Sequence, residues 1–153
     1  MFIVFLLSAA AVGAADSVVL GRASSNERMS YVENTCPEDA ICLHSWFKWV
    51  IDVAKTVSGP SIQPGRIVTA RMQHTSMIPS YRKRLRLFVL KPIDDPEERK
   101  MLRAEYYLEE MSEPHQMFCF LENPEGFGLQ TEETYIGTND VRKHCFKVPE
   151  TGR

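Results

Sequence analysis

Residues 46–57 read WFKWVIDVAKTV, the clearest structural signal in the chain. Apolar side chains occupy its odd-numbered positions, at Phe47, Trp49, Ile51, Val53 and Val57, with Lys55 as the exception. The even-numbered positions include Lys48, Asp52 and Thr56. Alternation of this kind, in β-branched and aromatic residues, is typical of a strand with one buried face. The stretch therefore predicts a long strand whose odd-numbered side chains enter the core.

Further strands are expected on either side of this one. Residues 58–65 read SGPSIQPG and supply turn chemistry, with Gly and Pro at both ends. The pattern predicts strands at 18–22, 66–74, 84–91 and 117–121, and short edge strands at 134–136 and 145–148. The side chains expected to face inward are Val68, Ala70 and Met72 on one strand and Leu85, Leu87 and Val89 on the next. Residues 23–39 are expected to form a loop.

One helix is expected late in the chain. Asp95 is a good capping residue, Pro96 suits the first helical position, and the acidic Glu97 and Glu98 suit the positive end of the helix dipole. Apolar residues recur at helical spacing as far as Met111. The spacing therefore predicts an amphipathic helix that reaches Met111 and packs on a sheet.

These elements predict a mainly β fold. Consecutive hairpins, one helix and four cysteines suggest a small antiparallel OB-like barrel with the helix closing one side, stapled by disulfides. Residues 16–153 are expected to form this single β-barrel domain.

The first fifteen residues have the composition of a secretory signal peptide. An apolar run at 2–7 is followed by small residues at 9–15, and no Lys or Arg precedes it. A buried N-terminal helix is the alternative interpretation. We expect cleavage before Ala15 or Asp16, a secreted or periplasmic protein, and no membrane span, because no later apolar stretch approaches the ~20 residues that a spanning helix needs.

Four cysteines, Cys36, Cys42, Cys119 and Cys145, lie beyond this leader. They allow three pairings. We favour Cys36 with Cys42 across a short polar turn, and Cys119 with Cys145 between two apolar runs. Zinc is the competing interpretation, but the chain has no CxxC spacing, and export favours disulfides.

Charge argues against a nucleic-acid partner. The chain has 18 Lys and Arg against 20 Asp and Glu, a net charge of −2. Proteins that bind nucleic acid through its phosphates usually carry a basic surplus. Nucleic-acid binding is therefore not expected.

Two segments of the chain resemble the netrin-like module. They are Val19-Leu20-Gly21-Arg22, and residues 46–53 leading into Val57-Ser58-Gly59. The resemblance implies an OB-type barrel of the kind found in secreted proteins, among them the tissue inhibitors of metalloproteinases. Those inhibitors chelate the catalytic zinc with a cysteine at the mature N-terminus. Here the first cysteine is Cys36, so the resemblance does not imply that mechanism.

No motif in the chain specifies catalysis, a metal or a cofactor. The four histidines, His44, His74, His115 and His144, are scattered, and no HExxH pattern is present. His74 and Ser76 could share one face of a strand, but no G-x-S-x-G elbow supports a nucleophile. Catalytic residues, metal ligands and cofactors are accordingly predicted to be none.

The basic run 82–86 is the sharpest charge feature. The apolar pattern favours a register that sets Ile51 opposite Met72, and therefore Asp52 opposite Arg71 on the outer side. The next hairpin would place Arg71 opposite Arg86. One carboxylate among these arginines leaves a positive surplus, unless another acid completes the row. The predicted anionic contact site consists of Asp52, Arg71, Arg86, Arg84, Lys83 and Trp46.

Two classes of function stay open. We favour an exported, monomeric, non-catalytic binding or inhibitory module that recognises a protein or an anionic envelope or extracellular polymer. The alternative is a small exported hydrolase whose site assembles from distant residues such as His74 and a carboxylate.

Overall fold

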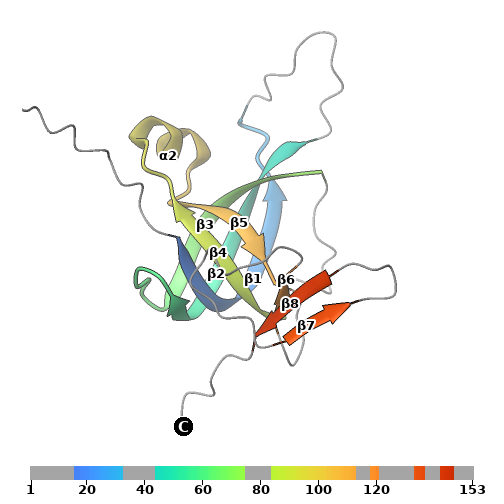
Figure 1. Cartoon of the computed structure of the whole chain (residues 1–153). Helices are drawn as coiled ribbons and strands as arrows, with labels where there is room; N and C mark the ends of the chain where they lie inside the picture. The colour runs from blue at the N-terminus through green and yellow to red at the C-terminus, as the bar shows by residue number, and fades with distance from the viewer. Residues whose placement is uncertain are drawn as a thin grey trace, which may run out of the picture.

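The computed structural model describes residues 16–32, 44–74, 84–112, 118–120, 133–136 and 142–146. Five strands close into a barrel (Figure 1): β1 Ser17–Arg28, β2 Ser45–Ser58, β3 Gly65–Gln73, β4 Leu85–Pro92 and β5 Tyr106–Met111. Their order is β1-β2-β3-β5-β4, and β4 returns to pair with β1. Neighbours are antiparallel except β3 and β5, which are parallel. The predicted OB-like barrel is confirmed.

A second sheet covers part of the barrel. It contains β6 Phe118–Phe120, β8 Arg142–Phe146 and β7 Glu133–Ile136, in that order. The predicted Cys119–Cys145 disulfide is confirmed and joins β6 to β8. Buried Phe120 packs on Val18, Leu87 and Val89 of the barrel. The helix α2, Pro96–Leu102, lies at the upper left of Figure 1, and the second sheet lies at the lower right.

Two predictions fall outside the described residues. They are the leader at 1–15 and the Cys36–Cys42 pair. Among the residues that are described, no helix is both long and apolar enough to cross a membrane.

The barrel interior is built on β2, as its alternation predicts. Phe47, Trp49, Ile51 and Val53 are each at most 5% exposed. They pack with apolar side chains of every other barrel strand, including Val19, Ala23, Ile67, Phe88, Leu90, Tyr106, Leu108 and Met111. The Trp49 Nε1 donates a hydrogen bond to the Gln73 Oε1 at 3.0 Å. One face of β2 therefore supplies much of the core.

The predicted register of β2 against β3 is wrong. Ile51 lies opposite Ile67, and not opposite Met72. The difference is an odd number of residues, so it reverses the faces of β3. Ala70 is buried on the outer side of the barrel, against α2, while Met72 is 52% exposed. Both faces of β3 carry covered apolar side chains, so alternation alone could not choose between them.

The predicted faces of β4 also need correction. Phe88 and Leu90 enter the barrel interior. Leu87 and Val89, which were expected there, pack outside it beneath the second sheet. A strand that is covered on both faces reads as a continuous apolar run and does not alternate.

The helix is shorter than predicted. Its N-cap is as expected, since the Asp95 Oδ1 accepts a hydrogen bond from the Glu97 amide at 2.9 Å and Pro96 follows. It ends at Leu102, and Arg103 has a left-handed backbone with φ of 50°. Residues 106–111 then form β5, which fills the gap between β3 and β4. Barrel closure here outweighs local helix propensity.

The first strand is longer than predicted. Residues 23–28, expected in a loop, continue β1 and pair with β2, with one register shift between Ala23 and Ser25. Ala23 is fully buried and Asn26 is 5% exposed, while Ser24 and Glu27 are exposed. Small and polar residues fill this segment and the register shift interrupts its alternation, so the strand had no clear pattern and the loop interpretation was wrong.

Gly21 marks the closest approach of β1 to β2. A Cβ at this position would lie 2.6 Å from the Asp52 backbone oxygen and 3.3 Å from Cγ2 of Ile51. Gly21→Ala must therefore push the strands apart, and we expect it to lower the free energy of unfolding by about 1–3 kcal/mol in urea denaturation. Ala54→Ser, at an exposed position of β2, is the control and should stay within about 0.5 kcal/mol. Equal stability of the two variants would contradict the close approach.

Candidate binding surface

The predicted contact site does not assemble. Asp52 is paired with Arg66, and Arg71 lies opposite Phe47 on the interior-facing side of β3. Arg86 is 6% exposed, and its Nη1 donates a hydrogen bond to the Ser112 carbonyl oxygen at 2.9 Å. The β3–β4 hairpin that would have joined Arg71 to Arg86 is not formed, because β5 lies between those strands.

The other predicted members are also dispersed. Arg84 is exposed just before β4, and Lys83 lies outside the described residues. Trp46 is half-buried, with its ring centre 6.1 Å from that of Tyr107. Burial and a hydrogen bond to the Glu98 carboxylate raise the pKa of Tyr107. Trp46 therefore belongs to the packing between the barrel and α2.

Arg71 is a half-buried charge at the barrel wall. Burial lowers the pKa of its guanidinium, and the carboxylates of Glu110 and Glu109 oppose that shift. The Nη1 atom is buried and has no hydrogen-bond partner among the described residues. Arg71 thus faces the inside of the barrel and does not extend the outer surface.

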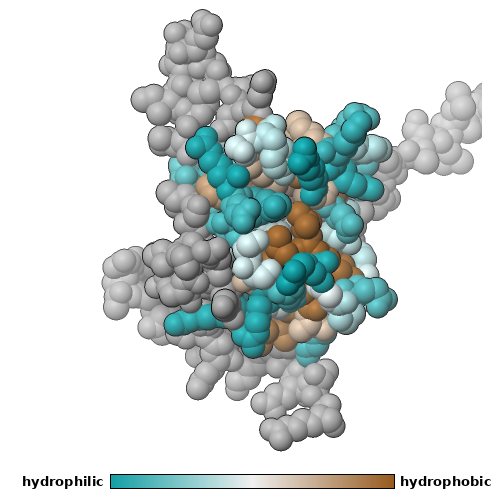
Figure 2. Space-filling view, turned by 180° about the vertical axis from the view of Figure 1, so that it is seen from behind, coloured by the Kyte–Doolittle hydropathy of each residue, from teal (hydrophilic) through white to brown (hydrophobic). Residues whose placement is uncertain are grey.

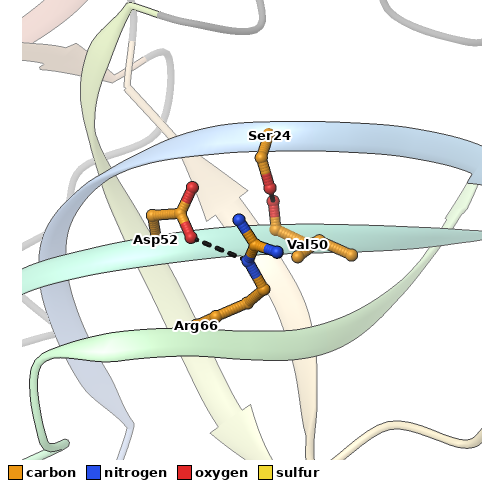
Figure 3. Close-up of polar contacts among 4 residues, drawn as sticks. All are labelled: Ser24, Val50, Asp52 and Arg66. Carbon is orange, nitrogen blue, oxygen red and sulfur yellow. Dashed lines mark hydrogen bonds and ion pairs between the residues drawn. The ribbon is translucent and has the colours of Figure 1, made fainter.

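A different row of charged side chains crosses the outer side of the barrel. Arg22 on β1 lies opposite Asp52 on β2, and Asp52 lies opposite Arg66 on β3. Directly paired residues project from the same side of a sheet, so the three side chains form one row. The Arg66 Nε donates to the Asp52 Oδ1 at 3.0 Å (Figure 3), with side-chain exposures of 69% and 46%. Two arginines therefore flank one carboxylate, which gives the row a formal charge of +1.

An apolar strip adjoins this row. Val50 and Val68 lie opposite each other on β2 and β3, and both are partly exposed. Ser24 donates its hydroxyl hydrogen to the Val50 carbonyl oxygen at 3.2 Å (Figure 3). Figure 2, seen from behind, shows an apolar patch with hydrophilic side chains around it. We call the surface formed by Arg22, Ser24, Val50, Asp52, Arg66 and Val68 the outer face.

The register that builds the outer face depends on the β2–β3 connection. Pairing of these strands ends at Val53 opposite Gly65, whereas the rest of β2 pairs with β1 alone. Thr56 anchors the connection, because its hydroxyl accepts from the Ile62 amide at 2.9 Å and donates to the Ile62 carbonyl at 3.2 Å. The turn expected at 58–65 agrees with the ends of β2 and β3, so the error lay in the register, since residues 54–58 have no partner on β3. The two Thr56–Ile62 hydrogen bonds lie within this unpaired part of the connection.

The structure also brings together two residues that looked scattered. The rings of His44 and His74 lie 3.8 Å apart, centre to centre, at the start of β2 and the end of β3. Within the described residues there is no group of three or more His, Cys, Asp or Glu side chains placed to hold a metal.

Comparison with protein-family models, with curated proteins and with solved structures finds no match to this chain. The outer face is therefore interpreted from its own geometry. Exposed guanidinium groups bind carboxylates and phosphates through paired hydrogen bonds, and an adjoining apolar strip adds buried area. The arrangement is suited to recognition.

Proposed function

We propose that this protein is an exported, non-catalytic binding module of the netrin-like type, and that its outer face binds a protein partner bearing acidic side chains. The row Arg22–Asp52–Arg66 carries the proposal. Its two arginines are exposed on β1 and β3, the two strands that flank β2. Arginine in such a position can engage a carboxylate bidentately, while Asp52 holds Arg66 in place.

Several observations support a protein partner over a nucleic acid. The chain has a net charge of −2, which repels a polyanion at long range. Next to the outer face, Lys48 forms an ion pair with Glu27, 3.7 Å apart, so Lys48 adds no net positive charge there. The apolar Val50 and Val68 suit a partner that presents an aliphatic or aromatic side chain beside its acid. Export is supported by the leader-like residues 1–15 and by the Cys119–Cys145 disulfide.

The proposal is tested by quantitative capture from periplasmic or secreted extract with immobilised protein. Partners of the outer face should be retained by the wild type and lost with Arg22→Ala/Arg66→Ala. The matched control is Arg28→Ala/Arg84→Ala, which removes two exposed arginines outside the row and leaves the net charge the same as in the test variant. For a purified partner we expect the affinity to fall at least about tenfold in the test variant, because hydrogen bonds to charged groups are lost.

The result should also depend on salt. Raising ionic strength from low to physiological should weaken the wild-type complex and have less effect on what remains in the test variant. Equal losses in both double variants would show that only overall charge matters. An unchanged affinity in Arg22→Ala/Arg66→Ala would show that the outer face does not bind the partner.

A further inference from the structure

A pair of histidines lies directly across two strands at the end of the barrel that is distant from the β2–β3 connection. Ser45 is paired with Gln73, so one further step in the same register sets His44 opposite His74. Their ring centres are 3.8 Å apart, with the planes tilted by 41°. Both side chains are exposed. Two imidazoles are thus placed on one face of the sheet by the backbone register, and not by chance rotamers.

A thioether lies next to this pair. Trp46 and Met72 form the adjoining row on the same face, two residues along each strand. Met72 is 52% exposed, unlike Met29, which is 3% exposed within a packed cluster. The indole of Trp46 is half-buried beside it. The sheet therefore presents two imidazole nitrogens, one soft sulfur and one aromatic ring in two neighbouring rows.

We propose that His44, His74 and Met72 form a binding site for Cu(I), with Trp46 as the aromatic wall beside the ion. Thioether sulfur is a soft ligand that selects Cu(I), and imidazole is a good ligand for copper in either oxidation state. An indole face attracts a cation through its quadrupole. The site is separate from the outer-face residues used in the proposed function and adds a second binding activity to the protein.

The distances allow the three ligands to converge. Directly opposite residues in an antiparallel pair have Cβ atoms about 4.5–5.5 Å apart, which is within the span of two imidazoles on one ion. Met72 has a flexible side chain that can reach along the strand to the same point. The rings of His44 and His74 are now in contact, and rotation of one exposed ring opens the space for the ion.

The ligand set suits Cu(I) better than zinc. Structural zinc is held by four ligands drawn from cysteine, histidine and carboxylate. In the part of the chain that the structure describes, no three such residues come together, and the third donor at this site is a thioether. A soft monovalent ion that accepts few ligands is the cation that two imidazoles and one thioether fit.

The test uses Ag(I) as a redox-inert probe and Cu(I) itself. The oxidised protein, verified to contain no free thiol, is titrated with silver nitrate in chloride-free buffer while amide shifts are followed by NMR. Cu(I) affinity is then measured anaerobically, by competition with a colorimetric Cu(I) chelator. We expect one equivalent of Ag(I) to shift the amides around His44, Trp46, Met72 and His74. Shifts confined to other regions, or none at one equivalent, would overturn the proposal without any mutation.

Variants identify the ligands. His44→Ala, His74→Ala and Met72→Leu should each weaken Ag(I) and Cu(I) binding at least about tenfold. The matched controls are Met101→Leu, which alters a thioether that is 50% exposed on α2, and His144→Ala, on the second sheet. Both controls should bind within about twofold of the wild type. Unchanged affinity in His44→Ala/His74→Ala would refute the site. Unchanged affinity in Met72→Leu would show that Met72 is not a ligand and would contradict the assignment of the site to Cu(I).

The proposed Cu(I) site and the proposed partner-binding face can be tested independently of each other. Arg22→Ala/Arg66→Ala should bind Ag(I) as the wild type does, and His44→Ala/His74→Ala should retain the protein partner. A loss of Ag(I) binding in the arginine variant would contradict the separation of the two sites.

Discussion

Trp49→Ala should lower the free energy of unfolding by about 3–5 kcal/mol, the range for truncating a large buried aromatic side chain. Trp49 is 1% exposed and packs in the interior cluster that all five barrel strands share. Its loss leaves a cavity that strands tied into a closed barrel cannot easily collapse to fill. It also removes the indole hydrogen bond to Gln73. Urea denaturation followed by far-ultraviolet circular dichroism measures the effect.

Trp46→Ala is the matched control for this prediction. It truncates the same side chain three residues earlier on the same strand, but on the outer side and only half-buried. We expect it to cost less than half as much, since less area is returned to water. If the two variants were equally destabilised, the assignment of the odd-numbered face of β2 to the core would be contradicted.

Removal of the Cys119–Cys145 disulfide should have the second-largest effect. The bond closes a loop with a sequence separation of 26. Loop-entropy arguments give about 3 kcal/mol for a loop of this size. Cys119→Ser/Cys145→Ser should therefore lower stability by about that amount, measured by urea denaturation. It should also loosen the packing of Phe120 over Leu87 and Val89, visible as faster amide exchange in β4.

Cys36→Ser/Cys42→Ser is the comparison for the disulfide. The bond predicted between Cys36 and Cys42 would close a much shorter loop, and the same entropy argument assigns it a smaller stabilisation. Peptide mapping without reducing agent should find Cys36 linked to Cys42 in the wild type. A greater loss of stability from the shorter link, or crossed pairs in the map, would contradict the prediction.

Sequence alone was sufficient where one face of an element is covered and the other is solvated. β2 shows this, because Phe47 to Val53 alternate buried and partly exposed side chains along the strand. The start of α2 was also predictable, since Asp95 and Pro96 act through local backbone chemistry. Both signals lie within a few neighbouring residues, which is the range over which sequence patterns are reliable.

Sequence was insufficient where coverage comes from distant parts of the chain. Leu87 and Val89 are buried by Phe120, and Ala70 is buried by the α2 region, so β3 and β4 carry two apolar faces each. Leu108 fits a helical stripe and a strand equally well, and only closure of the barrel selects the strand. These choices depend on tertiary contacts that local periodicity does not contain.

The candidate sites depend on register more than on residue type. Asp52 was predicted to lie among arginines, and it does, but its neighbours are Arg22 and Arg66. The connection held by Thr56 and Ile62 sets that register. The same shift sets His44 opposite His74, which no spacing rule for metal ligands would find, because the two histidines lie on different strands.

The order of strands in the barrel also has a kinetic consequence. β1, β2 and β3 follow one another and can pair as soon as they are synthesised, but β1 gains its second neighbour only when β4 is available. Pairing of segments this distant in the chain must first offset the entropy of closing a long loop, and folds dominated by such contacts reach the native state in milliseconds to seconds, not microseconds. Until residues 85–90 arrive, one side of β1 presents unpaired backbone groups, which can template association between chains. Nascent chains of this protein are therefore most vulnerable to aggregation between completion of β3 and completion of β4.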